Sequence, residues 1–362
     1  MRAILHIGTE KTGSSSIQSL LRKNRSALRR QGYQTSRELG RPSQIALAVA
    51  ALPTDVRWRV HRRLSLDTDE DVRAYRVDRR SALEQELAGR DGTLLLSCEQ
   101  LSKLPDEQSV VRLTEWLSCV VSQVTALVYV RRQDSFLVSL YSQALKSGRT
   151  APLDVPDEAV AGAGSKFDYW SLVSRWANVL GPDRVVVRVF ERDALVGGDV
   201  VKDYLDVVGM HPGVDLAMPT RRNPRLDATG AEFLRLLNHH IPGRSHGRDA
   251  QRGDVSPTVT RAAQDGPPLA MDPAEGRAFV ARFADGNSKV ARRYLGRQDG
   301  RLFSDEFPRG QSEGQPLSVE RAAEISAAMW MHKQQQYTDV LRRLRQDDDG
   351  QGDHDRDGSG SM

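Results

Sequence analysis

The chain has 362 residues, of which 39% are hydrophobic and 28% charged, and its net charge is +4. This composition is typical of a soluble globular protein, and no apolar run approaches the ~18 residues that a membrane-spanning helix needs. The apolar run at the start is also too short for a secretory signal, so we expect a cytoplasmic protein.

A short apolar strand and an amphipathic helix open the chain. Residues 3–7 form an apolar run that ends at a glycine, which is typical of a buried strand. Apolar side chains then recur at helical spacing from Ile17 to Leu28, which predicts a helix of about 15 residues starting near Ser14. The loop at 8–16 therefore joins a strand to the N-terminus of a helix.

The rest of the first half repeats this alternation of strand and helix. Buried strands are predicted at 93–97, 125–130 and 184–190, and helices at 70–90, 106–118 and 167–180. Such alternation indicates an α/β fold with a mostly parallel sheet and crossover helices. The C-terminal half is predicted to be mostly helical, with helices at 194–209, 227–240, 273–295 and 318–345.

Two stretches depart from this pattern. Residues 241–272 are rich in Gly, Pro, Ser, Asp and Arg, and we expect a mobile loop or an insertion there. Residues 346–362 hold six Asp and one Arg, so the net charge of this segment is −5 and that of the rest of the chain is +9. We expect this segment to be a disordered acidic tail. The sequence therefore predicts one domain over 1–345. Its basic charge suits an anionic ligand or a nucleic acid.

The loop after the first strand has the chemistry of an anion site. At a helix N-terminus, unpaired N–H groups point outward and the helix dipole favours negative charge. Lys11 adds a positive charge, and Ser14, Ser15 and Ser16 add hydroxyl donors. A Walker A loop places its lysine directly after a glycine, whereas Lys11 here comes two residues before Gly13. A capped turn with an incidental lysine is the alternative.

A second motif follows the predicted strand at 125–130. Arg131 ends this strand, and Ser139 lies eight residues further on, in a helix that Asp134 or Ser135 could cap. Ser139, Gln143 and Lys146 then share one helix face. The planar guanidinium of arginine matches two phosphate oxygens, so the pair could grip one phosphate. The alternative is a surface salt bridge and an ordinary helical serine.

Together these motifs resemble the family of sulfotransferases that use 3'-phosphoadenosine 5'-phosphosulfate (PAPS). Lys11-Thr12-Gly13-Ser14-Ser15-Ser16 is similar to its 5'-phosphosulfate loop, with serines in place of threonines, and the longer run from His6 is similar to the bacterial branch. Arg131, Ser139 and Tyr141 match its 3'-phosphate motif, although Gln133 stands where the family often has proline.

The resemblance implies a P-loop-like three-layer sandwich and a transfer of the sulfuryl group from PAPS that releases 3'-phosphoadenosine 5'-phosphate (PAP). It implies that Lys11 stabilises the bridging oxygen, that residues 12–16 hold the 5'-phosphate, and that Arg131 and Ser139 hold the 3'-phosphate. Lysine and arginine side chains would do the work of a metal ion, so no metal is expected.

A hydroxyl acceptor also needs a general base, and Glu99 is the candidate. It follows the predicted strand at 93–97, at the edge where α/β sheets place their ligand crevice. Sulfotransferases that use a glutamate have it in a similar Ser-x-Glu position, here Ser97 to Glu99. Alternatively, Glu99 only charges the N-terminus of the next helix. His6 is expected to be a packed core residue.

The resemblance implies that the acceptor is a hydroxyl or amine of a carbohydrate, glycolipid or small metabolite. We expect the loops 33–65, 146–168 and 241–272 to form its pocket. A lipid-linked acceptor would bring the protein into peripheral contact with a membrane. Two other functions stay open: a nucleotide-dependent kinase or phosphoryl transferase, and a non-catalytic binder of anions or nucleic acid. The 6% aromatic content argues against nucleic acid, and the oligomeric state is not predicted.

Overall fold

The computed structural model describes residues 1–40, 43–157, 164–210, 216–219, 226–241, 256–307 and 317–351, with the side chains of 343 and 345–351 left aside. These residues fall into two compact units. The described residues of the first unit lie within 1–137, 155–221 and 274–307, and those of the second lie within 138–154, 222–273 and 308–351. The single domain expected over 1–345 stays a prediction.

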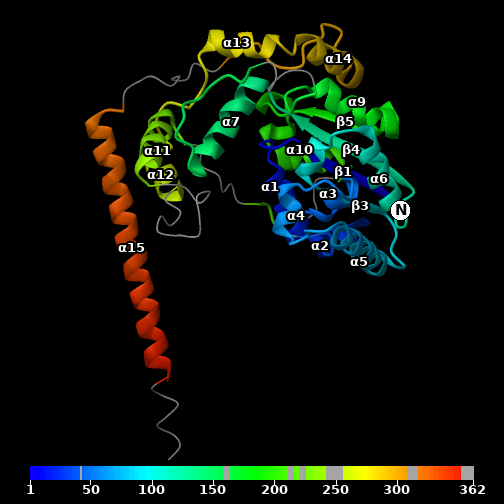
Figure 1. Cartoon of the computed structure of the whole chain (residues 1–362), viewed down its shortest axis with the longest axis horizontal. Helices are drawn as coiled ribbons and strands as arrows, with labels where there is room; N and C mark the ends of the chain where they lie inside the picture. Colours follow the sequence, from blue (N-terminus) through cyan, green and yellow to red (C-terminus); the bar gives the residue numbers. More distant parts are fainter. Residues whose placement is uncertain are drawn as a thin grey trace, which may run out of the picture. The chain divides into compact units, whose positions relative to one another are not determined.

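A five-stranded parallel sheet forms the centre of the first unit (Figure 1). Its strand order is β2-β3-β1-β4-β5, so β1 is central and Leu5 faces Leu96 on one neighbour and Ala126 on the other. A parallel sheet is normally covered on both faces, which explains the near-continuous apolar runs. The strands are β1 (Arg2–Gly8), β2 (Tyr33–Gln34), β3 (Thr93–Ser97), β4 (Gln123–Val130) and β5 (Val185–Val189).

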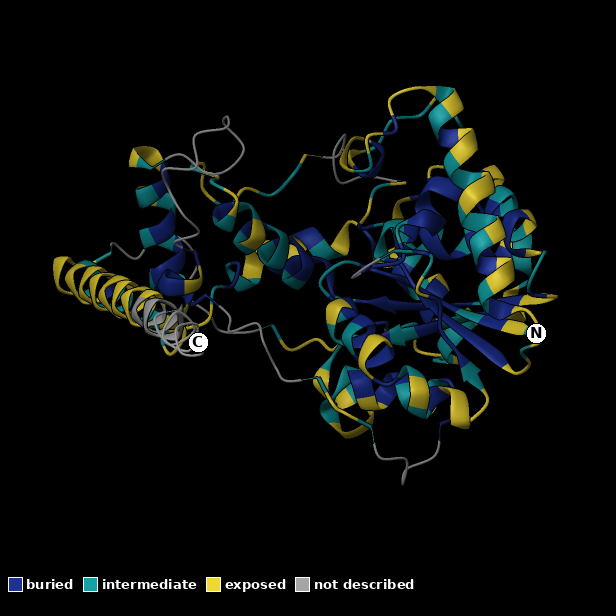
Figure 2. Cartoon of the chain, turned by 90° about the horizontal axis from the view of Figure 1, so that it is seen from below, coloured by how far each residue is buried: buried dark blue, intermediate teal, exposed yellow. Residues whose placement is uncertain are grey.

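Helices cover both faces of the sheet, so the unit is a three-layer α/β sandwich, as predicted. Figure 2 shows the buried strands between helices whose outer surfaces are exposed. The helices packed in the larger core cluster are α3 (Ala46–Ala51), α5 (Asp69–Leu87), α6 (Glu107–Leu117), α9 (Tyr169–Leu180) and α14 (Ala284–Leu295). Those packed in the other cluster are α1 (Ser14–Lys23), α2 (Arg25–Arg30) and α10 (Val200–Val207).

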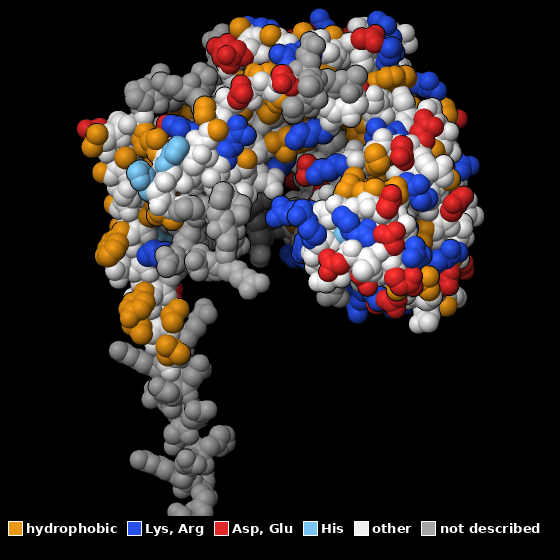
Figure 3. All heavy atoms as spheres, in the orientation of Figure 1, with side chains coloured by type: hydrophobic (Ala, Val, Ile, Leu, Met, Phe, Trp, Pro, Cys, Tyr) orange, Lys and Arg blue, Asp and Glu red, His pale blue; other side chains and the backbone are white. Residues whose placement is uncertain are grey.

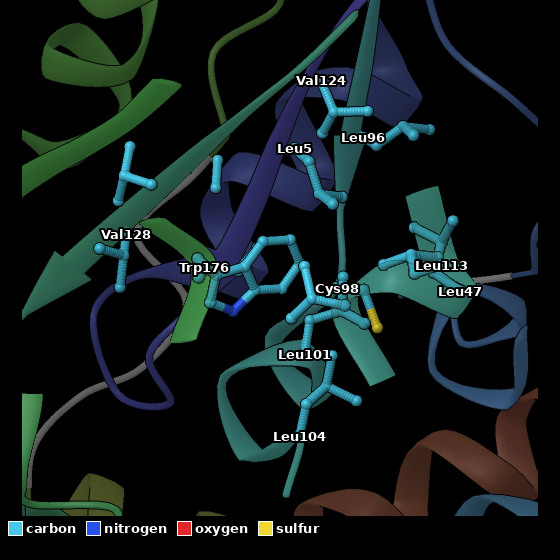
Figure 4. Packing of buried hydrophobic residues seen from close by; sticks show 14 of the residues in the cluster. Leu5, Leu47, Leu96, Cys98, Leu101, Leu104, Leu113, Val124, Val128 and Trp176 are labelled. Atoms are coloured by element: carbon cyan, nitrogen blue, oxygen red, sulfur yellow. The ribbon is translucent and has the colours of Figure 1, made fainter. Parts of the chain in front are cut away.

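The larger core cluster continues beyond the carboxyl end of β3. Trp176 of α9 and Leu113 of α6 pack with strand residues, and Leu101 and Leu104 extend the cluster past the strand (Figure 4). Each fully buried side chain of this size stabilises the fold by about 1.5–3 kcal/mol. This packing holds the segment that follows β3, where Glu99 lies.

Asn24 divides the helix that was expected to run for about 15 residues from Ser14. Its side-chain amide donates to the Leu20 carbonyl at 2.9 Å and to the Ala217 carbonyl at 3.0 Å, and its oxygen accepts from the Ala217 N–H at 2.7 Å. A side chain that bonds nearby backbone competes with the helical ladder. The chain therefore continues as a separate short helix, α2.

The second unit is helical and has a core of its own. Tyr141 and Leu145 of α7 (Gln133–Lys146) pack there with Leu234 and Ile325. Its other helices are α11 (Ala228–His240), α12 (Ser256–Ala262) and α15 (Val319–Gln351). Helix α12 lies in the stretch 241–272 that was expected to be a mobile loop or an insertion, and residues 242–255 of this stretch are outside the described residues.

Helix α15 enters the segment 346–362 that was expected to be a disordered tail, and residues 352–362 are outside the described part. The remaining helices, α4 (Arg59–Arg63) and α13 (Pro273–Ala281), are short. Within the described ranges, no helix combines the length and the apolar character that crossing a bilayer requires.

Candidate active site

The loop between β1 and α1 lies at the carboxyl edge of the sheet, next to β4. The N–H and the hydroxyl of Thr9 both donate to the Tyr129 carbonyl, at 2.9 and 3.0 Å. The buried hydroxyls of Thr12 and Ser14 donate to the Thr9 carbonyl, at 2.7 and 3.1 Å. These two hydroxyls therefore fix the shape of the loop, whereas Ser15 is exposed and Ser16 is half-buried.

The backbone of the loop turns through left-handed conformations at Lys11 (φ 62°) and Gly13 (φ 83°). A Cβ on Gly13 would lie 2.6 Å from Cγ1 of Val200 on α10, so only glycine fits there without a shift. Gly13 is also the N-cap of α1, and within the described structure no side chain caps that helix. The first N–H groups of a helix need acceptors from outside it, so this end is suited to an anion.

Arg131, the first residue of the second motif, lies against this loop. It follows the last residue of β4, and its Nη1 donates to the Lys11 carbonyl at 3.1 Å. Its guanidinium carbon lies 5.8 Å from the centre of the Phe190 ring, and its own carbonyl accepts from the Tyr169 hydroxyl. Arg131 and the loop, far apart in the sequence, are thus held side by side at the edge of two neighbouring strands.

The helix that carries Ser139 begins earlier than expected. Because α7 starts at Gln133, Asp134 and Ser135 lie in its first turn, and the prediction that one of them caps it is wrong. Asp134 instead forms a buried ion pair with Arg132 at 2.8 Å. The Gln133 side chain, where the resembled family often has proline, bonds the side chain of Asn287 at 2.9 Å. Ser139 is half-buried, in the part of α7 that belongs to the second unit.

Glu99 lies beside the first helix, at the start of the 3-10 helix η1 (Glu99–Lys103). Its Oε2 accepts from Nε2 of Gln18 on α1 at 2.6 Å and from the Ser43 hydroxyl at 3.4 Å. A Cβ on Gly8 would lie 3.2 Å from the Glu99 Cα, so β1 and η1 approach closely here. The carboxylate is therefore positioned one helical turn from the loop. Glu99 is also the first residue of η1, which is the position it needs if its role is only to place a negative charge at the N-terminus of that helix.

Further charged groups, which the sequence did not single out, surround the loop. Glu10 pairs with the Nζ of Lys103 at 2.8 Å. Burial lowers the pKa of Lys166, which also interacts with Glu10 and Lys103. Neither lysine belongs to a motif, so only the fold reveals them. The buried Gln18 could have been noticed, because it interrupts the apolar face of α1 between Ile17 and Leu21.

His6 is a core residue, as expected. It is fully buried, its Nδ1 lies 2.8 Å from the Ser97 hydroxyl, and burial lowers its pKa to about 3. It is therefore neutral near pH 7 and holds β1 to β3.

Among the described residues, no group of His, Cys, Asp and Glu could hold a metal ion. His239 and His240 are exposed, and His246 lies outside the described residues.

Comparisons with known proteins yield few relatives. No protein-family model matches the sequence. An uncharacterised protein of Archaeoglobus fulgidus is 25% identical over 228 residues, which cover 59% of this chain and 58% of that protein. A crystal structure of a sulfotransferase from Alicyclobacillus acidocaldarius is 16% identical, with a TM-score of 0.38 over 61% of this chain and 86% of the other. What the site does must therefore be argued from its own residues.

Proposed function

We propose that the protein is a sulfotransferase that moves the sulfuryl group of PAPS to a hydroxyl or amine of a small molecule, carbohydrate or glycolipid. The contact of Arg131 with the Lys11 carbonyl supports this most directly, because it sets a second cation beside the anion-binding loop. PAPS needs two anion-binding sites, since it carries a phosphosulfate at one end and a 3'-phosphate at the other. ATP has no 3'-phosphate to occupy the second site.

The proposed reaction is an in-line displacement at sulfur. The acceptor oxygen bonds to sulfur, the bond from sulfur to the bridging oxygen breaks, and that oxygen leaves with PAP. By analogy with phosphoryl transfer, the protein acts mainly by positioning and by stabilising charge. Lys11 neutralises the charge that builds on the bridging oxygen, and the N–H groups at the start of α1 hold the 5'-phosphate.

Glu99 takes the acceptor proton in this scheme. Gln18 fixes its carboxylate through Oε2, which leaves the other oxygen to face the acceptor. Arg131 binds the 3'-phosphate, and Ser139 is the second ligand that the sequence predicts for it. For an amine acceptor, the same carboxylate removes the proton from nitrogen.

The experiment is transfer of radiolabelled sulfate from PAPS to a mixed set of carbohydrate, glycolipid and small-molecule acceptors, with ATP and magnesium in a parallel reaction. We expect labelled product and PAP from the first reaction only. Lys11→Ala and Glu99→Gln should each lower the rate about 10²–10³-fold, while Glu115→Gln, an exposed position on α6, should not. Phosphoryl transfer from ATP in the absence of sulfuryl transfer would support the kinase function instead.

A further inference from the structure

Helix α15 carries a regular stripe of exposed side chains. Between Ala327 and Leu344, the members of this stripe follow one another at alternating steps of three and four residues, and all of them are exposed. This is the spacing of the a and d positions of a coiled coil. We call the stripe the α15 seam, and its members are Ala327, Trp330, Gln334, Tyr337, Leu341 and Leu344.

The α15 seam points away from the core of the second unit. Ile325, which is fully buried, and the half-buried Met329 pack in that core. Each lies two positions from Ala327, and residues two apart on a helix face nearly opposite directions, because each residue turns the helix by about 100°. Figure 3 shows apolar side chains along the outside of this helix. The seam is therefore a second apolar face, separate from the face that α15 uses within its own unit.

Among the described residues, the C-terminal part of α15 has little of the packing that normally stabilises a helix. Of the side chains described between Lys333 and Leu344, all are exposed except Asp339, which is half-buried. Helices in proteins owe most of their stability to the packing of an amphipathic face, and isolated helices shorter than about 12–15 residues are marginal in water. The helix nevertheless continues to Gln351. A partner on the α15 seam would supply the packing.

The apolar area along the seam is large enough for a dimer. Six large apolar side chains in the seam and directly beside it are between 38% and 70% exposed. They are Trp330, Met331, Tyr337, Val340, Leu341 and Leu344. Because an aromatic side chain can bury about 150–250 Å², these six expose on the order of 500 Å² per copy. A pair of seams would bury on the order of 1,000 Å², which is the least that a specific interface needs.

A second copy of the same helix fits the seam along its whole length. Two helices with apolar side chains at this spacing wind around each other and keep the two stripes in contact. The α15 seam contains no charged residue, and Gln334 is its one polar member. A single polar residue at such a position fixes the register and the number of strands of a coiled coil.

We propose that the α15 seam is an interface with a second copy of this chain and that the protein forms a dimer through a two-helix coiled coil. The same residues contribute from both copies, so the interface closes with two chains and does not extend into a filament. This inference concerns the second unit and does not depend on the proposed function.

Sedimentation equilibrium of the full chain tests the proposal, over about 1–100 µM protein because self-association depends on concentration. At the upper end we expect a mass twice the 40.3 kDa of one chain. Tyr337→Glu/Leu344→Glu should weaken association at least about 100-fold, because it places two carboxylates per copy in an apolar contact. Leu341→Ala/Leu344→Ala keeps the charge and the helix propensity, and should weaken it at least about 10-fold.

The matched control is Gln335→Glu/Gln336→Glu, which adds the same charge to two exposed residues of α15 outside the seam. It should keep the mass of the wild type. A wild type that is monomeric throughout, or a dimer that persists in both seam variants, would overturn the inference. A monomeric wild type that sediments with vesicles of phosphatidylcholine and phosphatidylglycerol would assign the seam to a lipid surface and overturn it as well.

Discussion

Gly13 is the residue at which the loop, the first helix and α10 meet. A methyl group there would be 2.6 Å from Val200, and the positive φ adds strain for any other residue. Lys11 accepts a positive φ in the same loop without being glycine. The position of the lysine therefore carries a conformational cost, which the bonds from Thr9, Thr12 and Ser14 to the backbone help to offset.

Replacing Gly13 by alanine should lower the free energy of unfolding by about 2–4 kcal/mol, because overlap with Val200 adds about 1–3 kcal/mol to the conformational cost. Gly296→Ala is the matched control, since Gly296 has a similar left-handed backbone (φ 65°, ψ 16°, against φ 83°, ψ 13° at Gly13) and a methyl group there would meet no atom of the described residues within 4 Å, its chain neighbours aside. Urea unfolding followed by tryptophan fluorescence measures both. Equal losses in the two variants would show that the contact with Val200 does not matter.

His6 should make stability depend on pH. Its pKa is about 3 in the folded protein and near 6.5 when unfolded, so below pH 6.5 only the unfolded chain takes up the proton. The stability that comes from keeping His6 neutral and buried is therefore complete above pH 6.5. As the pH falls below that value, the free energy of unfolding decreases by up to about 1.4 kcal/mol per pH unit. Between pH 6.5 and 4.5, the wild type should lose about 2 kcal/mol more than His6→Gln. Parallel stability curves for the two proteins would contradict this.

At the scale of single residues, the sequence predicted which side chains lie at the edge of the sheet but not all of their contacts. Lys11, Glu99 and Arg131 each follow an apolar run, and parallel strands end at one edge, so their proximity is predictable. The inward turn of the Thr12 and Ser14 hydroxyls depends on the path of the loop. The bond from Gln18 to Glu99 depends on the rotation of α1, which sequence spacing does not set.

Among the elements, α10 supports the loop from behind. Asp203 of this helix is fully buried and accepts from the Tyr129 hydroxyl at 2.8 Å and from Nε of Arg188 at 3.0 Å. These bonds join α10 to β4 and β5, and Val200 on the same helix is the neighbour of Gly13. Burial, together with the charge of Asp203, raises the pKa of Tyr129, which therefore stays a hydrogen-bond donor.

Asp203→Ala should lower the free energy of unfolding by about 3–5 kcal/mol, because it leaves Arg188 and the Tyr129 hydroxyl without their buried acceptor. The exposed Asp206 on the same helix provides the control, and Asp206→Ala should change stability by less than about 0.5 kcal/mol. Thermal and urea unfolding of both variants measure the difference. A loss below about 1 kcal/mol in Asp203→Ala would show that α10 is held by its apolar contacts alone.

The order and type of the long elements were predictable, since their apolar periodicity reflects the faces they bury. The strands predicted at 93–97 and 125–130 are confirmed as β3 and β4. The two-residue strand β2 is too short to show any period. The division of the first helix at Asn24 depends on a bond to Ala217, far along the chain, and no local pattern encodes it.

For the whole molecule, the loop, Glu99 and Arg131 lie in the first unit, at the carboxyl edge of its sheet, whereas Ser139 belongs to the second unit. The second unit has its own apolar core and carries exposed apolar side chains along α15, visible as orange spheres in Figure 3. Lys and Arg side chains are scattered among acidic ones over the visible face of the first unit, so the excess positive charge is not one continuous patch there (Figure 3).

If the site binds a nucleotide that carries both a 5'- and a 3'-phosphate, it must distinguish PAP from AMP. The two ligands differ only in the 3'-phosphate. By titration calorimetry the wild type should prefer PAP by at least about 100-fold. Arg131→Ala should cut this preference about 10- to 100-fold, since a hydrogen bond to a charged group contributes about 1.5–3 kcal/mol. Arg192→Ala, an exposed control, should retain it. Equal affinities for PAP and AMP would show that the site does not recognise a 3'-phosphate, and a preference that survives in Arg131→Ala would show that Arg131 does not bind it.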